Sequence, residues 1–147
     1  MKFLGHPLHM MLIHFPTALL PMNVVLDAIG FYKDDASFFQ AANYCLWGGV
    51  LSGLVAMVTG LIDTIRIPKE KKEAVGTAMI HGVVNTTVLL FFALLAYRSW
   101  QAYPEIGRPG LNSLIIKSIL LLVLFAGNYL GGKLVIGHQL FTNKTEN

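Results

Sequence analysis

Charged residues are scarce in this chain. Lys, Arg, Asp and Glu make up 13% of its 147 residues, whereas soluble domains average about 25%. The single cysteine, Cys45, excludes an internal disulfide and any metal or iron–sulfur site that needs several cysteines. No glycine-rich phosphate loop, aromatic RNA-binding motif or basic stripe is present, which argues against a nucleic-acid partner. Because 54% of the residues are hydrophobic, the composition is typical of a membrane protein.

Four long apolar stretches contain most of the hydrophobic residues. They cover residues 8–31, 39–65, 77–100 and 111–136. Each reaches the roughly 20 residues that a helix needs to cross a hydrocarbon core about 30 Å thick. The first is interrupted by histidines and prolines, so we interpret it as a retained helix and not as a signal peptide. The sequence predicts an all-α integral membrane four-helix bundle, forming one transmembrane domain with a polar tail at 138–147.

Basic residues are concentrated between the second and third stretches. This loop carries Arg66, Lys69, Lys71 and Lys72, whereas the loop before it holds only Lys33. By the positive-inside rule the basic loop is cytoplasmic. Four spans then place both termini in the cytoplasm as well.

All five histidines fall at the same predicted end of the bundle. His6, His9 and His14 lie at or just inside the start of the first stretch, His81 inside the start of the third, and His138 just past the fourth. Ionisable groups inside a span are costly and suggest function. His14 and His81 share one depth, about 8 Å inside their helices at ~1.5 Å per residue. Two imidazoles at one depth on different helices could ligate a haem, or each could simply bond a backbone carbonyl.

Two further polar residues lie near this histidine-rich end. Asn85 follows His81 by one turn, so it could hold the second ring nitrogen of a ligand or bond another helix. Asp63 could pair with a nearby arginine, orient a histidine or bind a metal. A non-haem site for zinc, copper or iron would draw on His6, His9, His81 and Asp63.

Small residues suggest how the helices pack. GxxxG pairs occur in the second and fourth stretches, at Gly49 and Gly53 and at Gly127 and Gly131. Such pairs let backbones approach closely, either within the chain or in a homodimer. Helices one and three carry histidines near their starts, and helices two and four carry these small residues. This two-plus-two pattern predicts a pseudo-twofold axis along the membrane normal.

The other half of the bundle has two charged groups inside its apolar stretches. Asp27 lies near the end of the first stretch and Lys117 near the start of the fourth, at similar depth. Isolated charges are costly inside a membrane. We therefore predict an ion pair between them if these two helices touch.

Several motifs together resemble the DUF2231 family of small bacterial membrane proteins. They are Gly5-His6-Pro7-Leu8-His9, residues 11–16, Leu26-Asp27, residues 59–63, His81 with Asn85, and residues 129–134. The usual His-Pro-x-His-Pro opening is altered here, because Met10 stands at the second proline. The resemblance implies a four-helix domain in the bacterial cytoplasmic (inner) membrane, and it favours His6 and His9 over His14. Relatives fused to Rieske-type iron–sulfur domains imply electron transfer, and so favour a b-type haem over a structural metal.

Three functions are compatible with these observations. The first is a small b-type cytochrome-like protein that binds haem b through His81 and either His14 or His9. It would pass electrons between a quinone pool and a partner protein, as an electron carrier or accessory subunit more than as an enzyme with turnover. The second is a metal-binding membrane protein. The third is a cofactor-free scaffold, accessory subunit or transporter whose histidines only form hydrogen bonds or sense pH.

Overall fold

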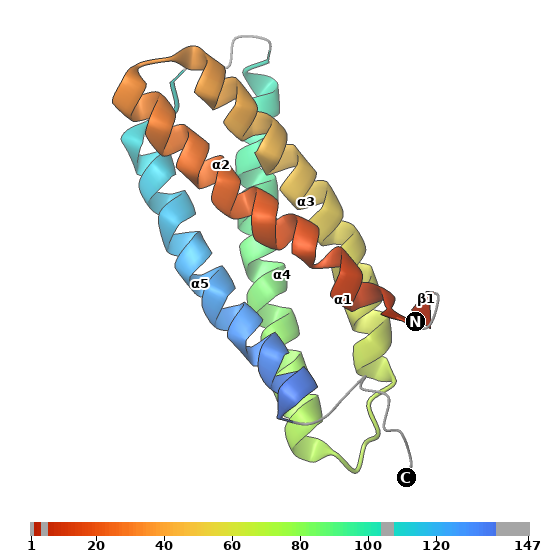
Figure 1. Cartoon of the computed structure of the whole chain (residues 1–147). Helices are drawn as coiled ribbons and strands as arrows, with labels where there is room; N and C mark the ends of the chain where they lie inside the picture. Colours follow the sequence, from red (N-terminus) through yellow and green to blue (C-terminus); the bar gives the residue numbers. More distant parts are fainter. Residues whose placement is uncertain (1, 4–5, 104–107, 138–147) are drawn as a thin grey trace.

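Four long helical segments run alternately up and down through the molecule (Figure 1). The computed structural model describes residues 2–3, 6–103 and 108–137. Its helices are α1 (Leu8–Leu12), α2 (His14–Lys33), α3 (Ala36–Ile65), α4 (Lys72–Gln101) and α5 (Leu111–Ile136). Before α1, the two-residue strands β1 (Lys2–Phe3) and β2 (His6–Pro7) pair antiparallel.

The four segments are long and apolar enough to cross a membrane. They are Leu8–Lys33, Ala36–Ile65, Lys72–Gln101 and Leu111–Ile136. Large apolar side chains on every segment point outward, among them Val25, Leu61, Leu90 and Leu122. Exposing such side chains to water is unfavourable, whereas contact with lipid chains is not. The expected all-α membrane-spanning fold is confirmed, and the outer surface of the bundle is suited to contact with the bilayer.

Some helices extend beyond the apolar stretches of the sequence. α4 begins at Lys72 although its apolar stretch begins near residue 77, and α3 begins at Ala36 and not near 39. Hydropathy marks the hydrocarbon layer, whereas a helix can continue into the polar interface by solvating its charged side chains there. The α3–α4 loop is therefore shorter than the polar segment that the sequence suggests.

The first membrane segment is broken near its start. α1 ends at Leu12, Ile13 lies in a turn, and α2 begins at His14. Pro16 accounts for the break, because proline lacks an N–H and its ring clashes with the carbonyl four residues earlier, that of Leu12. The short helix α1 packs against α3. This arrangement brings His9 against α3.

The bundle consists of two helical hairpins. α2 packs along α3 and α4 along α5, and contacts between α3 and α4 join the hairpins. On the opposite side α2 and α5 touch less extensively, and in Figure 1 they diverge toward the end at which α1 lies. The hairpins are therefore closely packed in one half of the molecule and spread apart in the other.

The closely packed half, near the α2–α3 loop, contains the main apolar core. Its buried side chains are Leu20, Leu46, Val50, Val88, Phe92, Ala96, Leu121 and Leu124. A Cβ added to Gly49 would lie 2.6 Å from Leu20 Cδ2, and one added to Gly53 would lie 2.6 Å from Leu89 Cδ1. The GxxxG pair of α3 therefore receives side chains from α2 and α4 of the same chain, so its packing requires no second copy.

Asp27 and Lys117 form the buried ion pair that their matching depths predict. Lys117 Nζ donates to Asp27 Oδ2 at 2.6 Å, and their side chains are 7% and 4% exposed. The pair connects α2 to α5 in the closely packed half. An unpaired charge in an apolar interior costs free energy. Each side chain lowers this cost for the other by supplying the opposite charge.

Candidate ligand site between the two hairpins

His9 is bonded to the backbone of α3. Its Nδ1 lies 2.8 Å from the carbonyl oxygen of Ala56, and the Thr59 hydroxyl donates to the same oxygen at 2.9 Å. A carbonyl oxygen can only accept a hydrogen bond, so Nδ1 must carry the ring proton and donate. The lone pair of the neutral imidazole is therefore on Nε2.

His81 repeats this arrangement in the other hairpin. Its Nδ1 lies 2.8 Å from the carbonyl oxygen of Gly127 on α5, so Nδ1 donates and Nε2 again keeps the lone pair. The Asn85 carboxamide lies beside the ring, with Nδ2 3.0 Å from His81 Nδ1. A carboxamide can turn end for end, and only its oxygen can accept from Nδ1–H. Asn85 is therefore suited to reinforce the same tautomer of His81.

A glycine lies against each imidazole, one helical turn after the carbonyl acceptor. A Cβ on Gly60 would be 2.7 Å from His9 Cε1, and a Cβ on Gly131 would be 2.7 Å from His81 Cε1. Each histidine is therefore bonded across its own hairpin to a small residue and packed on the glycine four positions later. The two hairpins repeat this motif. In α3 it uses Ala56 and Gly60, not the pair Gly49 and Gly53 on which the predicted two-plus-two pattern was based.

Both histidines line one cavity in the spread half of the bundle. Its volume is about 950 Å³, and its wall includes residues from every helix. Most of the lining is apolar, with a few polar groups such as Asn128, whose Nδ2 is buried without a partner among the described residues. His81 lies within electrostatic range of His9. A large apolar cavity with a few convergent polar groups is the usual form of a ligand or cofactor site.

His14 has a different environment from His9. It is exposed at the cavity wall, and its Nδ1 lies 3.3 Å from the carbonyl oxygen of Met11 within its own segment. The break before α2 separates His14 from α1, so depth counted along one continuous helix does not describe its position. The histidine whose surroundings match those of His81 is His9. The side chain of His6 and all of His138 lie outside the described part of the chain.

Asp63 also lines the cavity and lies within electrostatic range of His9. Its residue is 5% exposed. Among the described residues, however, no three His, Cys, Asp or Glu side chains gather where they could hold a metal ion. The described part of the chain therefore gives no support to the metal set of His6, His9, His81 and Asp63.

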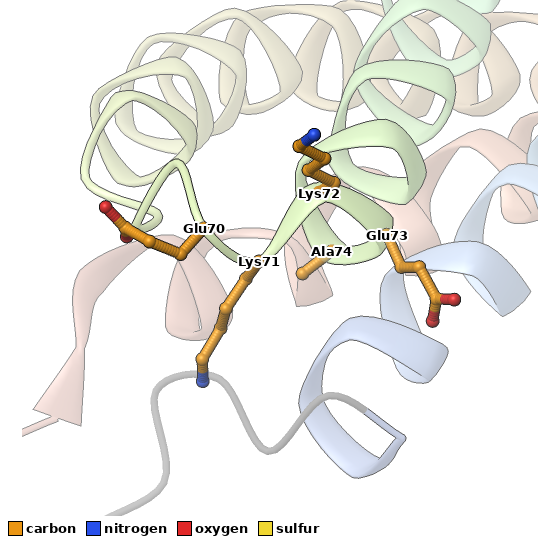
Figure 2. A pocket seen from close by; sticks show the side chains of 5 residues that line it. All are labelled: Glu70, Lys71, Lys72, Glu73 and Ala74. Atoms are coloured by element: carbon orange, nitrogen blue, oxygen red, sulfur yellow. The ribbon is translucent and has the colours of Figure 1, made fainter.

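A second hollow lies at the α3–α4 loop. It measures about 410 Å³ and is lined by residues 70–74. Figure 2 shows the side chains of Glu70, Lys71, Lys72 and Glu73 spreading away from one another. Nearby, Ile67 turns inward and packs on α4 and α5. This loop closes the end of the bundle, and its charged groups do not converge on a ligand.

The comparisons with known proteins bear on this geometry. The family model "Predicted membrane protein (DUF2231)" matches residues 5–144. The chain belongs to the DUF2231 family. The match includes the cavity-lining histidines His9, His14 and His81, and agrees with the resemblance seen in the sequence. No curated protein and no solved structure matches this DUF2231 protein.

The sequence did not reveal the backbone acceptors of the two histidines. A carbonyl group is present at every residue, so neither Ala56 nor Gly127 carries a distinctive side chain. One signal was present: each histidine precedes a small-xxx-small pair, Ala56 with Gly60 or Gly127 with Gly131, by 47 and 46 residues. This nearly equal spacing indicates that each hairpin contains the same arrangement of a histidine and a pair of small residues.

Proposed function

We propose that this DUF2231 protein binds one haem b between its hairpins and acts as a membrane-embedded electron carrier. The observation that carries the proposal is the matched contact of His9 and His81, each with Nδ1 against a backbone carbonyl oxygen of another helix. Both imidazoles donate from Nδ1 to a backbone carbonyl at 2.8 Å and keep the Nε2 lone pair. A histidine that ligates a metal through Nε2 needs this arrangement, with the other nitrogen held by an acceptor.

The size and apolar lining of the cavity support a large, mostly apolar ligand. Its volume of about 950 Å³ is near the upper end of ligand pockets, which span about 300–1,000 Å³. His9 and His81 both line this cavity and would supply the two nitrogens that hold the iron, as side chains on facing helices do in other helical bundles. Asn85 would hold the His81 ring, while the apolar wall would exclude water.

Bound haem would supply one-electron redox chemistry, with a potential set by its axial ligands and its burial. The chain would hold the ring and keep it out of contact with water. We further propose that the basic α3–α4 loop faces the cytoplasm of a bacterial cell, which places the site near the inner face of the cytoplasmic membrane. A quinone in the bilayer and a protein at the cytoplasmic face are then the natural redox partners.

The visible absorption spectrum of the detergent-purified protein tests this proposal directly. Expressed with a haem precursor supplied, the wild type should show the sharp reduced-minus-oxidised bands of low-spin haem at one haem per chain. His9→Ala and His81→Ala should each lose these bands, because each removes one of the two nitrogens that would hold the iron. His14→Ala is the matched control and should keep them. A haem-free wild type, or full haem retention by His81→Ala, would overturn the proposal.

A cofactor-free scaffold or transporter is the second candidate. It is favoured by the same hydrogen bonds, because each imidazole already connects two helices of its hairpin through a carbonyl. In that case the combined replacement of His9, His14 and His81 with apolar residues would lower the stability of the protein, because the bonds to Ala56 and Gly127 are lost. Metal analysis would find neither iron nor zinc nor copper.

A further inference from the structure

The two imidazoles rest on glycines at equivalent positions. A Cβ on Gly60 would lie 2.7, 3.0 and 3.2 Å from Cε1, Nδ1 and Nε2 of His9. A Cβ on Gly131 would lie 2.7, 3.1 and 3.4 Å from the same three atoms of His81. Carbon atoms in contact are normally about 3.5–4.0 Å apart. Each ring therefore occupies space that any side chain at its glycine would take.

The rings cannot easily move away from these glycines. Each Nδ1 is held 2.8 Å from a carbonyl oxygen on the same helix as its glycine. That carbonyl belongs to Ala56 in one hairpin and to Gly127 in the other, so ring and helix are fixed at two points. The carbonyl sets the tautomer, and the glycine sets how closely the ring approaches the helix. Together they determine the position of Nε2 in the cavity.

We propose that Gly60 and Gly131 are positioning residues of a two-fold ligand site. They hold the Nε2 atoms of His9 and His81 at matched distances from their helices, so that both nitrogens bind one shared ligand. The identity of that ligand as haem rests on the proposed function, whereas the positioning does not. One ligand would then bind per chain, held by one nitrogen from each hairpin.

Substitution of each glycine by alanine tests this inference. Gly60→Ala and Gly131→Ala should each weaken haem binding by about 10- to 100-fold, the range found when the residues that orient metal ligands are changed. The remaining haem should shift from low-spin to high-spin spectra, because one axial nitrogen is displaced. Gly76→Ala is the matched control on α4, since a Cβ there meets nothing within 4 Å. It should bind as the wild type does.

Rescue by free imidazole separates positioning from a general loss of structure. His9→Gly removes the side chain and should bind haem again when imidazole is added, because the free ring can take the place of the missing one. The double variant His9→Gly with Gly60→Ala should be rescued as fully as the single variant. A rescued double variant shows that Gly60→Ala acts on the position of the ring. Failure of rescue in the double variant alone would overturn the inference.

The haem-free protein supplies an independent measurement. In nitrogen NMR spectra of labelled histidines, Gly60→Ala should perturb the Nδ1–H signal of His9, and Gly131→Ala that of His81. Gly76→Ala should perturb neither. A wild type that takes up no haem would defeat the proposed function but leave this result standing. Unchanged histidine signals in both glycine variants would defeat the positioning role itself.

Discussion

At the scale of single residues, backbone atoms decide the chemistry of the histidines. A neutral imidazole has two tautomers, and its partner selects between them. Here the carbonyl oxygens of Ala56 and Gly127 select the form that leaves the ring lone pair on Nε2 of His9 and His81. The exposed imidazole of His14 instead bonds the carbonyl oxygen of Met11, three residues earlier in its own membrane segment. The partner, more than the residue type, distinguishes a ligand candidate from a solvated histidine.

The buried ion pair leads to a prediction at the same scale. Lys117→Met should lower the free energy of unfolding by about 3–5 kcal/mol, because it leaves the Asp27 carboxylate buried without its counter-charge. Thermal unfolding in detergent, followed by circular dichroism, measures the loss. The double variant Asp27→Leu with Lys117→Met removes both charges and should recover most of it. A double variant less stable than Lys117→Met would contradict this explanation.

At the scale of the element, the start of α3 shows how a helix end depends on one side chain. Asp35 Oδ1 accepts from the Ser37 amide at 2.9 Å and caps the helix. The hydrogen bonds from the Ser37 amide and hydroxyl hold the pKa of Asp35 below its ordinary value of 3.8. A carboxyl group with a lowered pKa stabilises the folded state above its ordinary value, and that stabilisation is lost as the pH falls through the folded pKa.

Hydrogen exchange at the start of α3 should therefore accelerate below pH 3.8, the ordinary pKa of Asp35. After correction for the intrinsic effect of pH, the Ser37 amide should be protected at pH 5 and less protected at pH 3. Asp35→Asn is the control, because asparagine also caps helices but does not titrate. The same loss of protection in Asp35→Asn would show that another group is responsible.

The break between α1 and α2 is a second feature of an element that depends on one residue. Pro16 prevents a continuous helix, and the separate α1 packs on α3. Hydropathy predicted the span but not this break, because an apolar stretch looks the same whether or not it bends. The break explains why His9, and not His14, has surroundings that match those of His81.

At the scale of the whole molecule, the two hairpins can be oriented in the membrane in two ways. The basic α3–α4 loop predicts that this end faces the cytoplasm. In a Cys45→Ser background, Lys69→Cys should resist a membrane-impermeant thiol reagent added to intact cells, whereas Ala102→Cys at the opposite end should react. Both should react after the cells are opened. Labelling of Lys69→Cys in intact cells would reverse the orientation and place the histidine site at the outer face.

The sequence by itself determined the class of structure and several of its parts. A hydrocarbon core about 30 Å thick requires long apolar helices, so four spans follow from hydropathy. The low dielectric constant of the membrane interior favours pairing of opposite charges. The ion pair between Asp27 and Lys117 could therefore be predicted from their similar depth. These predictions succeed because the membrane imposes the same constraint on every residue at a given depth.

The tertiary structure alone decided how the histidines are held. Whether Gly127 and Gly131 face another chain, another helix or a side chain depends on how the hairpins pack. The structure places Asn85 and His81 against them. Carbonyl groups and glycine surfaces carry no side-chain signal, so their partners become evident only when the helices are brought together. The hydrogen bonds and glycine contacts of His9 and His81 form only through that packing.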